Sequence, residues 1–265
     1  MKINIAVNAA TGRMGQQIIN QATSSSSVEL VAAFCRSGHP FFGKTVRGTG
    51  SENDIKYTNE IQFGVSSSQV VIDFSLPSVS LSLLDVVVKS NTALLIGTTG
   101  FNQKEKETIE KASQKIPIML ESNTSIGANM MMKLLSVAAK SIGQDAHIEI
   151  IEYHHKNKID APSGTAIKLG NIICEASNSN LEDRSVYDRR ENKHVRAQDE
   201  IGVSVVRAGD IVGKHQILFA LDNENITIEH EALSRECFAA GALKAAKWLT
   251  HQKNGLYTMQ DYLKA

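Results

Sequence analysis

The 265-residue chain is long enough for one large or two modest domains, each with its own hydrophobic core. Its 28 Lys and Arg residues balance 28 Asp and Glu residues, which argues against the broad basic surface of a nucleic-acid-binding protein. No apolar run approaches the roughly 20 residues that a membrane helix needs, and the N-terminal run is too short for a signal peptide. The three cysteines are far apart and lack metal-ligand spacing, so we expect reduced thiols in a cytoplasmic protein without membrane partners.

The first part of the chain alternates predicted strands with predicted helices. Short apolar runs predict strands at 3–7, 28–35, 70–74, 93–96 and 116–120, and helical patterns predict helices at 12–22, 77–88 and 104–115. Between residues 36 and 58 the Gly-rich, polar sequence predicts a long loop with room for one short strand. This β-α-β alternation predicts a Rossmann-type, doubly wound parallel sheet in an α/β fold.

The pattern changes after residue 125. Helices are predicted at 127–142 and 165–176, strands at 148–153, 201–207, 215–221 and 226–231, and a polar loop at 178–199. The short links at 208–210 and 222–225 are rich in turn residues and predict antiparallel pairing, so we expect an inserted α+β domain with a mixed or antiparallel sheet. The last predicted helix, 238–249, is expected to return to the first domain. The predicted domains are therefore 1–125 plus 235–265, and 126–234.

A candidate nucleotide-binding turn follows the first predicted strand. The sequence Ala9-Ala10-Thr11-Gly12-Arg13-Met14-Gly15 fits a Gly-x-x-Gly-x-x-Gly turn in which Ala9 replaces the first glycine. Gly12 would let the backbone approach a pyrophosphate at the helix N-terminus, and Gly15 would let the helix pack closely on the strand. A purely structural helix start is the alternative, but the position between strand and helix favours a dinucleotide-binding domain.

The second predicted strand ends in Phe34-Cys35-Arg36-Ser37, without the carboxylate that favours a free ribose 2'-hydroxyl. Arg36 can pair with a 2'-phosphate, so NADPH is predicted over NADH; a solvated loop arginine is the alternative. Two further segments, Gly97-Thr98-Thr99-Gly100 and Glu121-Ser122-Asn123-Thr124, end predicted strands on the same rim and are candidates for nicotinamide contacts. For the first of them, an ordinary turn is the alternative.

The segment 152–165 places two imidazoles and two ammonium groups within five residues, at His154, His155, Lys156 and Lys158. Histidine titrates near neutral pH and can act as a general acid. Ser163-Gly164-Thr165 then begins a predicted helix whose free N–H groups suit a carboxylate. Simple N-capping and a solvated basic loop are the alternatives.

A metal site is disfavoured, because adjacent histidines in extended backbone point to opposite sides and no nearby cysteine or carboxylate completes a ligand set. The segment therefore predicts a reductase acting on a small anionic substrate. Another NAD(P)-dependent enzyme on the same scaffold, such as an amino-acid dehydrogenase, and a non-catalytic dinucleotide sensor are the alternatives.

Over nearly the whole chain these motifs resemble those of bacterial dihydrodipicolinate reductases (4-hydroxy-tetrahydrodipicolinate reductases) of lysine and diaminopimelate biosynthesis. The resemblance rests above all on the segment from His154 to Thr165, and also on the glycine turn and on Gly97 to Phe101. It implies NAD(P)H-dependent reduction of 4-hydroxy-tetrahydrodipicolinate or dihydrodipicolinate, a cyclic dicarboxylate, to tetrahydrodipicolinate. It also implies a homotetramer assembled through the second domain, which binds the substrate.

The same resemblance implies a role for each matching residue. His154 is the proton donor to the ring carbon beside the hydride acceptor, and Lys158 assists proton transfer and loss of the substrate hydroxyl. His155, Ser163, Gly164 and Thr165 are expected to bind the substrate carboxylate. The expected cofactor contacts are Ala9, Ala10, Thr11, Gly12, Arg13, Met14, Arg36, Gly97, Thr98, Thr99, Glu121, Ser122, Asn123 and Thr124, and no metal is expected.

Three residues depart from the family pattern. Ala9 stands where glycine is usual, which costs around 1 kcal/mol if the position needs a positive φ. Cys35 stands where many members have an acidic residue, which argues against efficient use of NADH, although some members accept both cofactors. Thr124 replaces a commoner aromatic residue near the nicotinamide.

Overall fold

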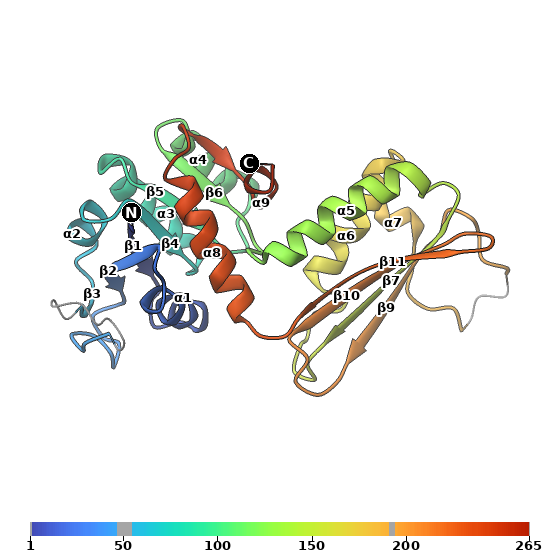
Figure 1. Ribbon diagram of the computed structural model, residues 1–265, viewed down its shortest axis with the longest axis horizontal. Helices are drawn as coiled ribbons and strands as arrows, with labels where there is room; N and C mark the ends of the chain where they lie inside the picture. Colours follow the sequence, from blue (N-terminus) through green and yellow to red (C-terminus); the bar gives the residue numbers. More distant parts are fainter. Residues whose placement is uncertain (1, 47–54, 191–193, 265) are drawn as a thin grey trace. The chain divides into compact units, whose positions relative to one another are not determined.

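The computed structural model describes residues 2–46, 55–190 and 194–264, which fold into two compact units (Figure 1). Unit 1 comprises Met1–Ile126 and Arg235–Ala265, and unit 2 comprises Gly127–Ser234. The chain of unit 2 is thus inserted into the chain of unit 1. Among the described residues, no helix is both long and apolar enough to cross a membrane.

Unit 1 is built on a parallel sheet of seven strands in the order β12-β6-β5-β4-β1-β2-β3. Its strands are β1 (Ile3–Asn8), β2 (Val28–Phe34), β3 (Tyr57–Thr58), β4 (Val70–Asp73), β5 (Ala93–Ile96), β6 (Pro117–Leu120) and β12 (Gly255–Tyr257). Strands β4 and β5 are buried along their whole length and β1 along all but Asn4, as expected where helices cover both faces of a parallel sheet. The predicted doubly wound α/β fold is confirmed.

Helices cover both faces of this sheet. They are α1 (Arg13–Thr23), α2 (Ile61–Ser66), α3 (Pro77–Lys89), α4 (Gln103–Ser113), α8 (Glu236–Leu249) and α9 (Met259–Tyr262). One apolar cluster joins α1 and α8 to one face, and another joins α2, α3 and α4 to the other. The sequence did not predict α2, α9 or β12, because such short elements show no clear periodicity and depend on packing for their stability.

Unit 2 has a mixed sheet of five strands in the order β11-β10-β7-β9-β8. The strands are β7 (His147–His154), β8 (Ser185–Val186), β9 (Ile201–Arg207), β10 (Gly213–Ala220) and β11 (Asn225–Ala232), and the helices are α5 (Ile126–Ile142), α6 (Gly164–Ala176) and α7 (Leu181–Arg184). Apolar side chains of α5 and α6 share one core with inward-facing residues of β7, β9 and β10. The elements α7 and β8 lie in the predicted loop 178–199; its residues 191–193, like 47–54 of the loop 36–58, are outside the described residues.

The antiparallel pairing predicted for the two short links is right for one and wrong for the other. Strands β10 and β11 form the expected antiparallel pair, whereas β9 and β10 do not pair with each other. Strand β7 lies between them, parallel to β9 and antiparallel to β10. The link after β9 crosses the end of β7, where Ala208 N donates to His154 O at 2.9 Å and Lys156 N donates to Gly209 O at 3.1 Å. A short link brings two strand ends close together, but it does not exclude a third strand between them.

Candidate active site

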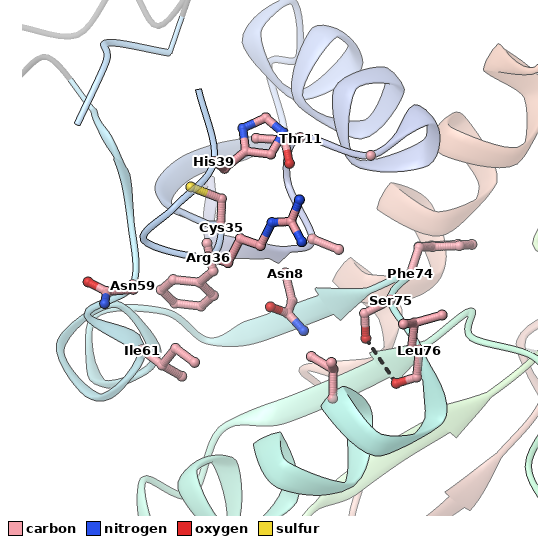
Figure 2. Close-up of a pocket in the computed structure, with 14 residues that line it drawn as sticks. Asn8, Thr11, Cys35, Arg36, His39, Asn59, Ile61, Phe74, Ser75 and Leu76 are labelled. Atoms are coloured by element: carbon pink, nitrogen blue, oxygen red, sulfur yellow. Dashed lines mark hydrogen bonds between the residues drawn. The ribbon is translucent and has the colours of Figure 1, made fainter. Parts of the chain in front are cut away.

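A cavity of about 530 Å³ in unit 1 lies where the strands β1, β2 and β4 end (Figure 2). Asn8 and Ala9 line it after β1, Cys35 and Arg36 after β2, and Ser75 after β4. The chain runs outward from β1 to one edge of the sheet and from β4 to the other, so the cavity occupies the point where the strand order reverses. Doubly wound sheets bind nucleotides at this point.

The turn between β1 and α1 is tight and places residue 9 in the left-handed region. Ala9 has a φ of 49°, and Gly12 N donates to Ala9 O at 2.9 Å. A Cβ on Gly15 would lie 2.4 Å from Ala9 O, which confirms that this glycine lets the helix pack closely on the turn. Ala9, Thr11 and Gly12 line the cavity.

The other residues of this turn have different surroundings. Ala10 is buried, Met14 is half-buried against the core and Arg13 is exposed. The cavity, the close backbone turn and the start of α1 together fit a dinucleotide pyrophosphate.

Replacing Ala9 by glycine is expected to raise the free energy of unfolding by up to about 1 kcal/mol, because only glycine adopts a positive φ without a Cβ penalty. The measurement is urea-induced unfolding of the full chain. Ala10→Gly is the matched control, since Ala10 is buried and is not among the residues with positive φ. It is expected to lose stability, and an equal loss in Ala9→Gly would contradict strain at position 9.

Arg36 contributes positive charge to the cavity. Its side chain is exposed, and among the described residues no carboxylate pairs with it. The neighbouring Cys35 is buried, and burial raises the pKa of its thiol, so this strand end carries no negative charge. Figure 2 shows Arg36 in the cavity with Thr11, Asn8 and Ser75 around it.

The buried carboxylate of Asp73, which the sequence did not indicate, connects the strand ends next to the cavity. Asp73 is fully buried at the end of β4; its Oδ1 accepts from Asn8 Nδ2 at 2.8 Å and its Oδ2 accepts from Ser80 Oγ. Thr98 joins the same network, because its Oγ1 accepts from Ser75 N at 2.9 Å and lies 3.0 Å from Ser80 Oγ. The sequence feature that could have indicated it is an acidic residue at the end of an otherwise apolar strand. The network ties together the ends of β1, β4 and β5.

Three more of the predicted cofactor contacts, Gly97, Thr98 and Thr99, follow β5. A Cβ on Gly97 would lie 2.1 Å from the ring of Phe74, a residue that lines the cavity. Thr98 is buried and Thr99 is exposed. None of these three residues lines the cavity itself; Gly97 contacts Phe74 and Thr98 bonds to Ser75, and those two residues line it.

Side chains of the segment after β6 are engaged in hydrogen bonds within the protein. Glu121 Oε2 accepts from Met259 N at 3.3 Å, and Asn123 Oδ1 accepts from Ser125 N at 3.0 Å. Thr124 is buried, and its hydroxyl donates to the carbonyl of Phe238 at 2.7 Å. Ser122 is the exposed side chain of the four predicted here. Any ligand contact of Glu121 or Thr124 therefore falls to backbone atoms.

In unit 2, a buried glutamate binds the predicted proton donor. Glu152 on β7 is fully buried, and its Oε2 is hydrogen-bonded to Nδ1 of His154, two residues along the same strand. Its Oε1 accepts from Ser163 N at 3.0 Å and from Arg207 Nη2 at 2.9 Å. Both oxygens of this carboxylate therefore have partners in the protein.

Burial and charge shift the titration of these groups. Burial by itself raises the pKa of Glu152, but Arg207, Ser163 and His154 together hold it below its ordinary value. Burial lowers the pKa of His154, Glu152 opposes this effect, and the charges of Lys158 and Arg207 reinforce it. Without a bound anion, His154 is therefore mainly neutral at neutral pH.

Lys158 lies beside this pair and is held by its own loop. Its ammonium bonds both carboxylate oxygens of Asp160, at 2.8 and 2.9 Å, and this pairing lowers the pKa of Asp160. Arg207 fixes the loop from the other side, because its guanidinium donates to the carbonyls of Lys158 at 3.3 Å and Asp160 at 2.6 Å. The sequence pattern did not indicate that Arg207 belongs to this site.

The start of α6 shows N-capping and still leaves free donors. Ser163 caps the helix, its Oγ accepting from Ala166 N at 3.1 Å and contacting Nε2 of His215 at 3.1 Å. The N–H of Ser163 itself binds Glu152. Within residues 2–46, 55–190 and 194–264, no acceptor is recorded for the N–H groups of Gly164 and Thr165, which are the first two of the helix. N-capping is confirmed, and it leaves these two donors for an anion.

Unit 2 contains two further histidines of interest, His155 and His215. Nδ1 of His155 is the one buried side-chain N or O atom of the described chain without a hydrogen-bond partner, which suits a residue that awaits a ligand. His215 on β10 lies edge-on to His154, with ring centroids 5.2 Å apart, and burial lowers its pKa to about 4. It is therefore neutral at neutral pH.

Glu152, His154 and His215 each offer one potential metal-ligand atom, all within 4.8 Å of one another. The sequence pattern indicated only the adjacent histidines; in the structure Glu152, two residues earlier on β7, bonds to His154, and the fold brings His215 beside it. All three residues already have hydrogen-bond partners in the protein, and the guanidinium of Arg207 binds the same carboxylate. That cation disfavours a divalent metal at this position.

Comparison with known proteins covers both units. Residues 3–124 match the family model "Dihydrodipicolinate reductase, N-terminus", and residues 127–263 match "Dihydrodipicolinate reductase, C-terminus". A protein of Nitrosomonas europaea named 4-hydroxy-tetrahydrodipicolinate reductase is 41% identical over 262 residues, which cover 98% of either chain. One of the same name from Buchnera aphidicola subsp. Baizongia pistaciae is 40% identical over 265 residues, 98% of this chain and 97% of that one.

Solved structures agree on the fold. A dipicolinate-bound dihydrodipicolinate reductase from Paenisporosarcina sp. TG-14 superposes with a TM-score of 0.79 at 24% identity, covering 97% of this chain and 98% of that one. An amine dehydrogenase from Mycobacterium smegmatis superposes with a TM-score of 0.58 at 8% identity, covering 97% and 95%. At such identities these likenesses establish the architecture alone.

Proposed function

The chain belongs to the dihydrodipicolinate reductase family, and from this premise we propose that it reduces 4-hydroxy-tetrahydrodipicolinate, or dihydrodipicolinate, to tetrahydrodipicolinate with NAD(P)H in lysine and diaminopimelate biosynthesis. The observation that carries the proposal is the grouping, within unit 2, of a buried His154, Lys158 and the two free N–H groups at the start of α6. A proton donor beside an anion site is what reduction of a conjugated cyclic dicarboxylate needs.

Unit 2 holds the substrate in this proposal. One carboxylate accepts from the N–H groups of Gly164 and Thr165, with Ser163, His155 and Lys158 around it. Negative charge arriving beside His154 favours its protonated form, which counters the lowering of its pKa by burial. His154 then donates a proton to the ring carbon next to the one that is reduced, and Lys158 assists the loss of the hydroxyl.

Unit 1 holds the cofactor in this proposal. The turn from Ala9 to Met14 receives the pyrophosphate, and the segments 97–99 and 121–124 lie toward the nicotinamide. Support comes from the cavity at the switch point of the sheet and from the close approach at Gly15. When bound, the reduced nicotinamide supplies the hydride.

The test is oxidation of NADPH, followed by absorbance, with freshly generated substrate and with a panel of amino acids. Oxidation with the dihydrodipicolinate precursor and none with amino acids is expected. Oxidation with an amino-acid-derived substrate instead would indicate another dehydrogenase on this scaffold. Cofactor binding without turnover of any substrate would indicate a dinucleotide sensor.

NADPH is the proposed preferred cofactor, with Arg36 as the partner of the 2'-phosphate. Arg36→Ala is expected to weaken NADPH binding roughly 10- to 100-fold, the usual range for a charge-assisted hydrogen bond, and to affect NADH much less. The measurement is the Kd of each cofactor by fluorescence titration. Arg36→Lys retains the charge and is expected to fall between the two. Equal losses for both cofactors would exclude the 2'-phosphate assignment.

We also propose a cytoplasmic homotetramer assembled through the sheet of unit 2. Helices α5 and α6 share a core with one face of this sheet, while Ile151, Val206 and Leu218 on its other face are only half-buried. The three cysteines are free thiols, as suits a reducing compartment. Light scattering of the purified protein is expected to give the mass of four chains, and a monomer would count against the proposal.

A further inference from the structure

We propose that Glu152 is the positioning residue of the proton-transfer site, and that its carboxylate fixes the His154 ring so that Nε2 delivers the proton. The proposal deepens the proposed function and rests on it, since His154 is the donor assigned there. Glu152 itself is fully buried and acts through His154.

The carboxylate of Glu152 determines the tautomer of His154. Arg207 at 2.9 Å and the Ser163 N–H at 3.0 Å both donate to Oε1 of Glu152, and they keep the carboxylate ionised. An ionised carboxylate only accepts hydrogen bonds, so Nδ1 of His154 must be the donor to Oε2. The neutral ring therefore carries its hydrogen on Nδ1 and its lone pair on Nε2. A proton taken up and passed on must travel through Nε2.

Gly213 leaves space around Nε2 of His154. A Cβ added to Gly213, the first residue of β10, would lie 3.1 Å from this nitrogen, so the glycine leaves Nε2 uncrowded on that side. Gly213 has no positive φ, which means that its backbone does not require glycine. A larger residue here would crowd the proton-transfer atom without touching Glu152.

Ser163 and Arg207 share the Glu152 carboxylate with His154. Through Ser163 N, Glu152 holds the first turn of α6, where the substrate carboxylate is proposed to bind. Through Arg207 it is connected to the carbonyls of Lys158 and Asp160. One buried carboxylate thus sets the position of the proton donor relative to the lysine and to the anion site.

The charges facing His154 come from several elements. Glu152 lies on β7, Arg207 on β9, His215 on β10 and Lys158 in the loop after β7. Of these, Glu152 supplies the negative charge that favours the imidazolium, while the cations oppose it. Glutamine at position 152 has one acceptor oxygen for three donors and no charge. Its NH₂ group would face another donor.

The experiment compares the full-length wild-type protein with Glu152→Gln and with the control Glu149→Gln. Glu149 lies on the same strand, where Arg189 at 3.2 Å and Arg196 at 3.3 Å pair with its carboxylate, outside the His154 network. The readouts are ¹⁵N NMR of the imidazole nitrogens of His154, assigned with His154→Gln, the dependence of kcat on pH, and the Kd of NADPH.

We expect wild-type His154 to carry its hydrogen on Nδ1 and to titrate at Nε2. In Glu152→Gln the tautomers mix, the pKa of His154 falls, the alkaline limb of the kcat profile moves to lower pH, and kcat drops roughly 10- to 100-fold with unchanged NADPH binding. Glu149→Gln is expected to match wild type in every readout. A wild-type ring protonated on Nε2, or a Glu152→Gln variant with wild-type tautomer and pH profile, overturns the proposal.

If Glu152→Gln does not fold, the same measurements are made on Gly213→Ala. A loss of kcat in Gly213→Ala with Nδ1 of His154 still protonated supports the proposal, and an unchanged kcat overturns it. Loss of wild-type turnover on chelation, restored by Zn²⁺, overturns it because Glu152 would then be a metal ligand. The NMR result does not need turnover, so a fixed tautomer in a protein that fails to reduce the substrate refutes the proposed function rather than the Glu152–His154 coupling.

Discussion

His154→Gln is expected to lower kcat by roughly two to four orders of magnitude, the usual contribution of a general acid. Glutamine keeps a polar side chain of similar length but cannot carry the proton. His154 is 8% exposed and hydrogen-bonded to a fully buried carboxylate, so few other donors can take its place. Because His154 lies in unit 2 and the nucleotide cavity lies in unit 1, the Kd of NADPH should change little.

The measurement is steady-state oxidation of NADPH with freshly made substrate, together with a separate titration of NADPH binding. His147→Gln is the control, since His147 begins the same strand with an exposed side chain. It should retain wild-type kcat. Near-wild-type turnover of His154→Gln would exclude this histidine from its proposed role, whether or not His147→Gln changes kcat.

The second large effect is expected at Gly241, in the middle of α8. An alanine inside a helix normally stabilises it by about 1 kcal/mol relative to glycine. Here a Cβ would lie 1.9 Å from the carbonyl oxygen of Thr124 and 3.0 Å from its carbonyl carbon, and backbone atoms cannot move aside as a flexible side chain can. Gly241→Ala should therefore lower the free energy of unfolding by about 3 kcal/mol or more, the upper range for overpacking.

The same substitution should disturb the loop after β6, because the Thr124 hydroxyl is bonded to the carbonyl of Phe238 in the first turn of α8. Urea-induced unfolding gives the stability. Gly38→Ala is the matched control, since nothing lies within 4 Å of a Cβ at position 38 and its φ is not positive. A gain in stability for Gly241→Ala, as helix propensity alone predicts, would show that the close approach of α8 to this loop is absent.

The long elements of unit 1 were predictable because their signals are local. Strand β5 is found where it was predicted, at 93–96, and the helices α1, α3 and α4 lie within two residues of their predicted bounds. An apolar run with turn residues on either side, or a helical pattern with a proline in its first turn, is complete within a window of about a dozen residues. The elements α2, β12 and α9 have no such window.

The candidate site was predictable only in part, for the same reason. His154, Lys158 and the start of α6 lie within one short segment, and their chemistry is apparent from spacing alone. Arg207 and His215 come from strands more than 50 positions away, and nothing in the segment 152–165 indicates that they join it. Asp73 and Asn8, 65 residues apart, were missed beneath the nucleotide turn in the same way.

Residues close together in the chain were enough to predict the alternation of strands and helices, the position of the nucleotide turn, and the basic segment with its helix start. Only the folded structure shows that β7 separates β9 from β10, that Ala9 adopts a positive φ, and that Glu152 binds His154, Arg207 and Ser163 together. Strand order and buried hydrogen-bond partners depend on which distant segments meet, and that choice is made by the packing of the whole unit rather than by local residue preferences.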